Sequence, residues 1–228
     1  MNGTTDNDDD GWEVVAPKQK RRNNRKKDIP PPPVATYIPP PTTTTTLFEP
    51  YLLLLVGLQG SGKSTFASYL QTSMPWKYVR INQDTLGNRS ACEELTRSTL
   101  LNLKEPRIPI IDRCNVNSEQ RRSFLNIAQK EFKIPVDCIV FQYNLETCVG
   151  RCKQRGNNHE TLRPGEERQA VERMADLWNP PSLSKNVTDV VLRQGKRGRD
   201  NVEIFRSVRY VSSFEMVDQL LKEYLKIE

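Results

Sequence analysis

One segment of nine residues carries the chemistry best suited to binding phosphate. Residues 57–65 read Gly-Leu-Gln-Gly-Ser-Gly-Lys-Ser-Thr and fit the pattern G-x-x-x-x-G-K-[S/T]. Glycines at these places let backbone amides turn inward around phosphate oxygens, and a helix that begins at Lys63 points its positive end at the same anion. In such loops the lysine reaches the β and γ phosphates, and the hydroxyl of Ser64 ligates Mg²⁺. The segment predicts a nucleoside triphosphate site made by Gly57, Gly60, Ser61, Gly62, Lys63, Ser64 and Thr65.

Two aspartates are placed to work beside this loop. Phosphoryl transfer needs a carboxylate that organises the metal and a group that orients the attacking hydroxyl. Asp112 ends the apolar run 108–111, and Asp84 follows the short run 78–81. In a doubly wound sheet, groups at the carboxyl ends of neighbouring strands face the loop after the first strand. Asp112 is therefore a candidate for the nucleotide site and Asp84 for the attacking hydroxyl, and the alternative role of each is a helix or turn cap.

These residues need a sheet to hold them, and the sequence predicts one. Residues 51–56 form an uninterrupted apolar run, which is typical of a strand buried on both faces of a parallel sheet. Strands and helices alternate after it, which favours an α/β fold with a parallel sheet. We expect strands at 51–56, 78–81, 108–112, 136–143 and 202–211, and helices at 63–71, 89–103, 118–132, 145–154, 166–178 and 214–227.

The composition excludes several classes of enzyme. The chain of 228 residues has one histidine, His159, so histidine-triad hydrolases and multi-histidine zinc centres lack their residues. Only 36% of residues are apolar and the mean hydropathy is −0.66, which indicates that part of the chain builds no core. The formal net charge is +6, which suggests an anionic partner.

The N-terminal part accounts for the low apolar content. Residues 1–49 combine an acidic run, a basic run, proline clusters and five consecutive threonines, so we expect a disordered tail before a folded domain at 50–228. The basic cluster at 18–27 fits a nuclear localisation signal, a phosphate-binding arm or a solvated linker. Residues 1–50 hold seven bases and seven acids, so the whole positive excess lies in the domain.

No targeting or membrane segment is expected. The chain has no apolar stretch of about 18 residues or more, and its N-terminus lacks the pattern of a secretory signal. Five cysteines in a domain of this size read as packed thiols in a reducing compartment, since Cys148 and Cys152 have no second metal-binding pair. We expect a monomer in the nucleus or cytoplasm that does not bind membranes.

Several blocks of sequence occur together in the order found in one known family. After residues 57–65 come Asn-Gln-Asp-Thr-Leu-Gly at 82–87, Ile-Asp-Arg-Cys-Asn at 111–115, and Arg-Cys-Lys-Gln-Arg-Gly at 151–156. Over about residues 51–180 the chain resembles the polynucleotide 5′-hydroxyl kinase family, including the kinase half of polynucleotide kinase/phosphatase and the kinase-like modules fused to aprataxin-type proteins. The resemblance implies a three-layer P-loop NTPase fold with a parallel sheet and a helical lid.

The resemblance also implies roles for individual residues. Asp84 matches the general base that takes the proton of the 5′-hydroxyl, and Asp112 matches the carboxylate of the second strand. Arg151 and Arg155 match lid arginines that clamp the ATP phosphates. Independently, arginines four apart share one face of a helix and suit phosphate oxygens, although a solvated helix face is the alternative. Asn115 and Arg121 fall where the family has an asparagine and an arginine.

The chain departs from the family at two places near the expected base. The family sequence Asn-Arg-Asp is Asn-Gln-Asp here, so Gln83 removes a positive charge beside Asp84. Gly87 stands where the phage enzyme has an arginine that meets the substrate phosphate, although the animal kinase half also has glycine there. These departures leave open a second reading, a non-catalytic ATP-binding module that recognises nucleic-acid ends.

The positive charge is concentrated after the expected lid begins. Residues 151–209 carry 13 bases and eight acids, and residues 194–199 read as an exposed basic loop. This excess suits a polyanionic acceptor, with ordinary solubility charge as the alternative because no aromatic stacking pattern accompanies it. Together the sequence predicts an ATP- and Mg²⁺-dependent kinase of 5′-hydroxyl ends of DNA or RNA, active in nucleic-acid repair or processing. A kinase for a small hydroxylated metabolite is the third reading.

Overall fold

The computed structural model describes residues 36–39, 49–155, 165–181 and 203–226. The chain divides into two compact units, residues 1–34 and 35–228, and all of the described residues belong to the second. Among them, no helix is both long enough and apolar enough to cross a bilayer. The basic cluster at 18–27, His159 and the loop at 194–199 lie outside the described residues.

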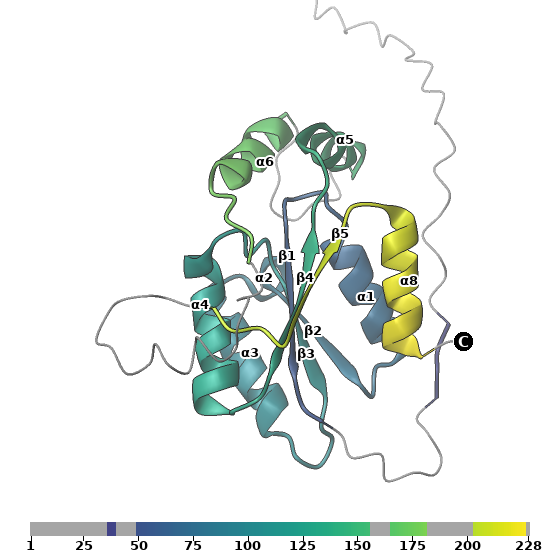
Figure 1. Ribbon diagram of the computed structural model, residues 1–228, viewed down its shortest axis with the longest axis vertical. Helices are drawn as coiled ribbons and strands as arrows, with labels where there is room; N and C mark the ends of the chain where they lie inside the picture. The colour runs from purple at the N-terminus through teal and green to yellow at the C-terminus, as the bar shows by residue number, and fades with distance from the viewer. Residues whose placement is uncertain (1–35, 40–48, 156–164, 182–202, 227–228) are drawn as a thin grey trace, which may run out of the picture. The chain divides into compact units, whose positions relative to one another are not determined.

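A parallel sheet forms the centre of the described domain (Figure 1). The strand order is β2-β3-β1-β4-β5, and every neighbouring pair runs parallel. The middle strand β1 is buried along its whole length, as its apolar sequence predicts for a strand covered on both faces. The strands are β1 (Leu52–Gly57), β2 (Tyr78–Asn82), β3 (Ile108–Asp112), β4 (Val136–Phe141) and β5 (Ser207–Val211).

Helices cover both faces of this sheet, which gives the expected three layers. They are α1 (Lys63–Ser73), α2 (Gln83–Leu86), α3 (Arg89–Leu101), α4 (Ser118–Asn126), α5 (Leu145–Arg155), α6 (Glu167–Asp176) and α8 (Phe214–Leu225), with a π-helical turn at Ile127–Glu131. Figure 1 shows α1 and α8 on one side of the sheet and α3 and α4 on the other. Helices α5 and α6 lie beyond the carboxyl ends of the strands, where a lid belongs.

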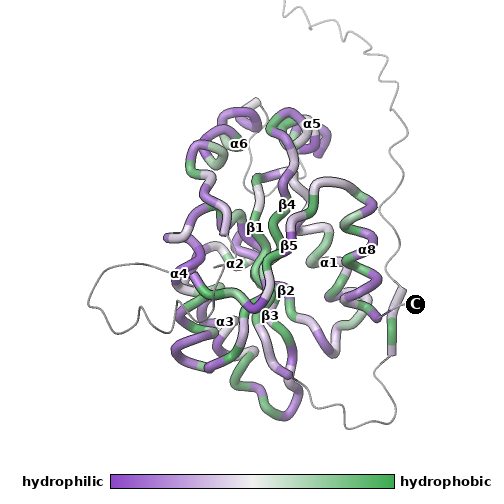
Figure 2. Tube along the Cα trace, viewed as in Figure 1, coloured by the Kyte–Doolittle hydropathy of each residue, from purple (hydrophilic) through white to green (hydrophobic). Residues whose placement is uncertain are grey.

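Each face of the sheet has its own apolar core, because successive side chains of a strand point to opposite faces. Leu53 and Leu55 pack with Phe66 of α1 and Leu221 of α8 on one face. Leu54 packs with side chains of α3 and α4 on the other. Figure 2 shows hydrophobic residues concentrated along the central strands, with hydrophobic and hydrophilic residues mixed along the helices. The sheet is therefore a rigid base for its carboxyl edge.

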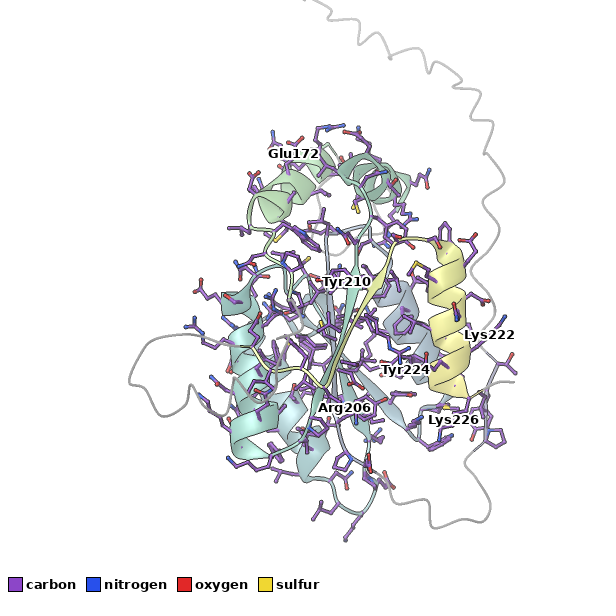
Figure 3. All side chains as sticks on the ribbon, viewed as in Figure 1. Glu172, Arg206, Tyr210, Lys222, Tyr224 and Lys226 are labelled. Atoms are coloured by element: carbon purple, nitrogen blue, oxygen red, sulfur yellow. The ribbon has the colours of Figure 1, made fainter. Side chains whose placement is uncertain are left out.

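The last strand joins the sheet from far along the chain. Arg206, which precedes β5, forms an ion pair with Asp137 of β4, and Ser207 donates a hydrogen bond of 2.8 Å to the same carboxylate. The hydroxyl of Tyr210 donates to the carbonyl of Pro181 at 2.6 Å. Figure 3 shows Arg206 just before this strand and Tyr210 on it, with Tyr224 on helix α8. These contacts fix the second edge of the sheet.

Several details differ from the sequence-based expectation. The helix expected at 118–132 is α-helical only to Asn126 and continues as the π-helical turn, and the strand expected at 136–143 ends at Phe141. Helix α2 was not expected, since four residues give too short a pattern to detect. The strand expected at 202–211 is found only over Ser207–Val211 among the described residues. Residues 36–39, assigned by sequence to the disordered tail, lie against the domain: the Ile38 amide donates to Ser73 at 2.7 Å, and the Trp76 indole donates to the Ile38 carbonyl at 2.9 Å.

Candidate nucleotide site

The loop between β1 and α1 leaves the first amides of α1 open to an anion. Gly62 is the N-cap of α1, with φ +101°, and it contributes no side-chain hydrogen bond to the helix. The first turn of α1 contains no acidic residue. Since the first amides of a helix have no partners within the helix and carry partial positive charge, this end of α1 attracts phosphate.

Two further glycines are required by close contacts around the loop. A Cβ atom on Gly57 would lie 2.6 Å from the Ser61 hydroxyl oxygen. Gly60, with φ +78°, lies under α5, and a Cβ atom there would collide with the carbonyl oxygen of Cys148 and lie 3.0 Å from the Cys152 sulfur. The lid helix therefore packs directly on the phosphate loop, and only glycine permits that approach.

Lys63 is buried and already directed into the loop. Its ammonium donates hydrogen bonds to the Leu58 carbonyl at 2.8 Å and to the Ser61 hydroxyl at 3.3 Å. An ammonium has three hydrogens, so one donor is left for a ligand. Ser61 is also buried, whereas Thr65 is exposed on the outer side of α1.

Asp112 lies at the centre of a network of polar side chains. The Ser64 hydroxyl donates to its Oδ1 at 3.1 Å. Its Oδ2 accepts from Arg80 Nε at 2.7 Å and from Asn82 Nδ2 at 2.9 Å. The carboxylate side chain is only 1% exposed. The structure thus joins the two residues expected to organise the metal, and adds a guanidinium that the sequence analysis did not assign to the site.

Asn82 connects this network to Asp84. The β2–β3 register places Asn82 beside Asp112. While its Nδ2 bonds Asp112, its Oδ1 accepts from the Thr85 amide at 3.0 Å and so caps α2. Asp84 lies in the first turn of that helix and is exposed. One side chain therefore fixes both carboxylates at the same edge of the sheet.

This edge also holds most of the unsatisfied polar atoms. Buried polar groups are normally hydrogen-bonded, so exceptions point to a ligand or to water. The described residues include six buried side-chain atoms without a partner, and four belong to Gln59, Gln83, Arg113 and Asn115. All four residues lie in or next to the loops after β1, β2 and β3. Open helix amides, a directed lysine, hydroxyl and carboxylate oxygens, and these orphaned atoms fit a triphosphate with Mg²⁺.

Arg113 extends the site on the side of Asp84. Its guanidinium carbon lies 5.5 Å from the Phe124 ring centroid, and its Nη1 is one of the atoms without a partner. Burial lowers the pKa of this arginine, and nearby Arg89 lowers it further. Burial raises the pKa of the Cys92 thiol, which Arg113 lowers and Asp84 raises. Both charges therefore act on one thiol of α3, so Asp84 and Arg113 both lie near Cys92.

Arg151 approaches the phosphate loop from the lid. Its Nη1 donates to the Gly60 carbonyl at 3.4 Å. Its guanidinium carbon lies 4.3 Å from the ring centroid of Tyr143 and 4.8 Å from that of Phe214. Arg155 is the last residue of α5 and is half-buried. The structure brings Arg151 to the loop, whereas its contacts do not place Arg155 there.

A cavity of about 480 Å³ opens beside Leu58 of the phosphate loop. Tyr143 and Leu145 line it at the start of α5, and Trp178 lines it beyond α6. Phe214 at the start of α8 is 71% exposed, which is unusual for a phenylalanine. Aromatic side chains therefore border this side of the phosphate loop.

Asn115 and Arg121 support the loop from beneath. Asn115, at φ +47°, donates to the Leu55 carbonyl of β1 at 2.8 Å. The buried Arg121 donates to the Asn115 carbonyl at 2.9 Å and forms a two-point ion pair with Glu203, at 2.8 and 2.6 Å. Both residues match the family pattern, and their contacts show that they position the strand end.

The sequence analysis missed Arg80, Arg113, Tyr143 and Phe214. Arg80 and Asn82 do leave a signal, because two polar residues at alternate positions end an otherwise apolar strand. Their contact with Asp112 depends on the β2–β3 register, which the sequence does not reveal. Phe214 comes next to the loop only through the parallel pairing of β5 with β4.

Comparisons with known proteins agree with this architecture. A sequence model of the AAA domain matches residues 52–181. The transcription factor bHLH140 of Arabidopsis thaliana is 28% identical over 155 residues, which make up 66% of this chain and 16% of that protein. The chain therefore spans a small part of the length of this curated relative.

Two solved structures share the fold. A fungal RNA kinase has a TM-score of 0.57 at 17% identity, over 79% of this chain and 45% of the other. Kti12 of Chaetomium thermophilum, solved in complex with ADP-AlF3, has a TM-score of 0.52 at 16% identity, over 77% of this chain and 97% of the other. The expected P-loop fold, with its parallel sheet, is confirmed.

Proposed function

Because the chain belongs to the AAA domain family and has a P-loop kinase-like fold, we propose that it phosphorylates the 5′-hydroxyl ends of DNA or RNA with ATP. The reaction would serve nucleic-acid repair or processing, in the nucleus or cytoplasm. The single observation that carries the proposal is the Asn82 bridge, because Asn82 bonds Asp112 and also caps the helix whose first turn contains Asp84. A loop that only stored a nucleotide would not need the second carboxylate.

The phosphate loop and the lid helix α5 would together hold ATP, the phosphate donor. The amides at the start of α1 would hold the β and γ phosphates, and the third hydrogen of the Lys63 ammonium would meet a γ oxygen. Arg151 would move from the Gly60 carbonyl to the transferring phosphoryl group, since a charged oxygen is the stronger acceptor. Tyr143 and Phe214 would then border the nucleoside.

Ser64 and Asp112 would hold Mg²⁺. A hydroxyl and a carboxylate are oxygen ligands of the kind that Mg²⁺ prefers, with water completing its coordination. The metal would neutralise the charge that develops on the β and γ oxygens during transfer.

Asp84 would take the proton of the attacking hydroxyl. It is exposed, so an acceptor can reach it, and it lies in the first turn of the capped helix α2, with Arg113 also near Cys92. Arg113 supports a nucleic-acid acceptor, because its positive charge, which acts on the same thiol as Asp84, would attract a phosphate of the acceptor strand. The similarity to a fungal RNA kinase supports the same class of acceptor.

Transfer of labelled γ-phosphate to a 5′-hydroxyl oligonucleotide tests the proposal. We expect Asp84→Asn to lower kcat by about 10²–10⁴-fold, the usual contribution of a general base, with nucleotide affinity unchanged. Asp218→Asn, which removes an exposed carboxylate of α8, is the matched control and should leave kcat unchanged. Absence of transfer by the intact wild-type protein at low salt with Mg²⁺ would refute the proposal.

A non-catalytic ATP-binding module is the second candidate, because Gln83 places a neutral side chain beside Asp84. It predicts that wild type binds ATP and oligonucleotide without transfer and that Asp84→Ala changes neither affinity. A competition assay separates the proposed function from a kinase for a small metabolite. If the chain is a polynucleotide kinase, an oligonucleotide acceptor should suppress phosphorylation of a nucleoside, whereas the nucleoside should suppress phosphorylation of the oligonucleotide only weakly.

A further inference from the structure

The guanidinium of Arg80 occupies one oxygen of the carboxylate that faces the phosphate loop. Arg80 Nε and Nη2 both lie 2.7 Å from Asp112 Oδ2. The aspartate side chain is 1% exposed and the arginine side chain 25%, so solvent reaches the pair mainly from the side of the arginine. The pair is neutral as a whole, and the low exposure of Asp112 makes its charge costly without a partner.

The fold fixes Arg80 in this place. Arg80 and Asn82 are two residues apart on β2, so their side chains leave the same face of the sheet. The Arg80 amide donates to Gln71 Oε1 of α1 at 2.6 Å, which ties this part of the edge strand to the helix that follows the loop. Asp112 Oδ2 therefore accepts hydrogen bonds from Arg80 and Asn82, while among the described residues Oδ1 accepts one from the Ser64 hydroxyl alone.

Without nucleotide, a divalent ion that approaches Ser64 and Asp112 encounters the neutral Arg80–Asp112 ion pair and not an unpaired carboxylate. The nearby guanidinium repels the ion, whereas it attracts the triphosphate. We propose that Arg80 is a positioning residue that keeps the metal site closed to metal alone, so that the divalent ion enters together with the nucleotide. This inference rests on the proposed function only in taking Ser64 and Asp112 as the metal end of the nucleotide site.

The proposal predicts two effects of opposite sign when the charge of Arg80 is removed. Arg80→Gln keeps an amide donor near Asp112 but deletes the cation. Affinity for a divalent metal without nucleotide should rise about tenfold, and affinity for nucleotide without metal should fall about tenfold, as expected for one unit charge close to a divalent cation or a polyanion. Structural damage to the site would lower both affinities.

Two binding titrations test this without any acceptor. Mn²⁺ alone is titrated by electron paramagnetic resonance, and a fluorescent ATP analogue is titrated in excess EDTA, with thermal unfolding as the check on folding. Arg80→Lys keeps the charge and should stay within twofold of wild type in both titrations. Arg97→Gln, which breaks an exposed pair with Glu131, is the matched control and should change neither.

Unchanged or weaker Mn²⁺ binding by a folded Arg80→Gln variant would overturn the proposal. If that variant does not fold, Arg80→Lys decides, because a tenfold rise in its Mn²⁺ affinity would show that the geometry of the guanidinium and not its charge closes the site. Failure of the proposed function would appear differently, as absent transfer to oligonucleotides with these two affinities behaving as predicted.

Discussion

Replacement of Gly60, in the phosphate loop, has an effect on the free energy of unfolding that can be estimated from the structure. At φ +78° an alanine is strained by about 1–2 kcal/mol. Its Cβ would also collide with the carbonyl oxygen of Cys148, and overpacking of this kind typically costs about 1–3 kcal/mol. We therefore expect Gly60→Ala to lower the free energy of unfolding by about 2–5 kcal/mol.

Gly62 provides a matched control in the same loop. It too has a positive φ, of +101°, but a Cβ atom there would have no neighbour within 4 Å. Gly62→Ala should cost about 1–2 kcal/mol, from backbone strain alone. The difference between the two variants therefore measures the packing of α5 on the loop.

Urea denaturation of the two variants, combined with titration of a fluorescent ATP analogue, tests this reasoning. Gly60→Ala should also weaken nucleotide binding more than Gly62→Ala, because it displaces α5 or the loop. Adding Cys152→Ala to Gly60→Ala should restore little, since the nearest atom is a backbone oxygen and not the Cys152 sulfur. Equal losses in both glycine variants, or full rescue by Cys152→Ala, would refute the argument.

Three further outcomes are expected. Arg121→Met should lower the free energy of unfolding, measured in urea, by about 3–5 kcal/mol, because it leaves the Glu203 carboxylate without its buried partner. A loss below about 1 kcal/mol would contradict the pairing. The Arg168 guanidinium lowers the pKa of Glu146 below its ordinary 4.5, so this pair stabilises α5 against α6 above about pH 4.5 and is lost as pH falls; the difference in Tm between wild type and Glu146→Gln should vanish between pH 6 and pH 3. Cys92, Cys138, Cys148 and Cys152 are buried, whereas Cys114 is only partly buried, so a thiol reagent at pH 7.5 should label Cys114 in the first, fast phase of the reaction, and Cys114→Ser should remove that phase.

The sequence predicts those parts of the fold that depend on local pattern. The apolar run before Gly57, the glycine spacing and the buried strand that ends at Asp112 were sufficient to predict the sheet and the phosphate loop. Each of these signals is contained in fewer than ten consecutive residues. Asp112, which was expected to face the phosphate loop, accepts a hydrogen bond from the Ser64 hydroxyl at 3.1 Å.

Contacts set by register or by distant pairing were not predictable in this way. Arg80 reaches Asp112 only because β2 pairs with β3 in one particular register. Phe214 reaches Arg151 only because β5 returns to the sheet beside β4, and α5 turns toward the loop. Arg113 was given no role from the sequence, and its unsatisfied nitrogen is visible only in the folded domain, where its guanidinium lies over the Phe124 ring.

The pairing of Arg121 with Glu203 links the state of the phosphate loop to the progress of protein synthesis. Glu203 and the following strand β5 are made after all of the residues of the loop, and a ribosome adds them seconds later. Until Glu203 arrives, the guanidinium that supports the Asn115 carbonyl lacks its carboxylate partner. A nascent chain that has passed Trp178 but not Glu203 should therefore hold nucleotide poorly, so we expect nucleotide binding to begin only after Glu203 has been made.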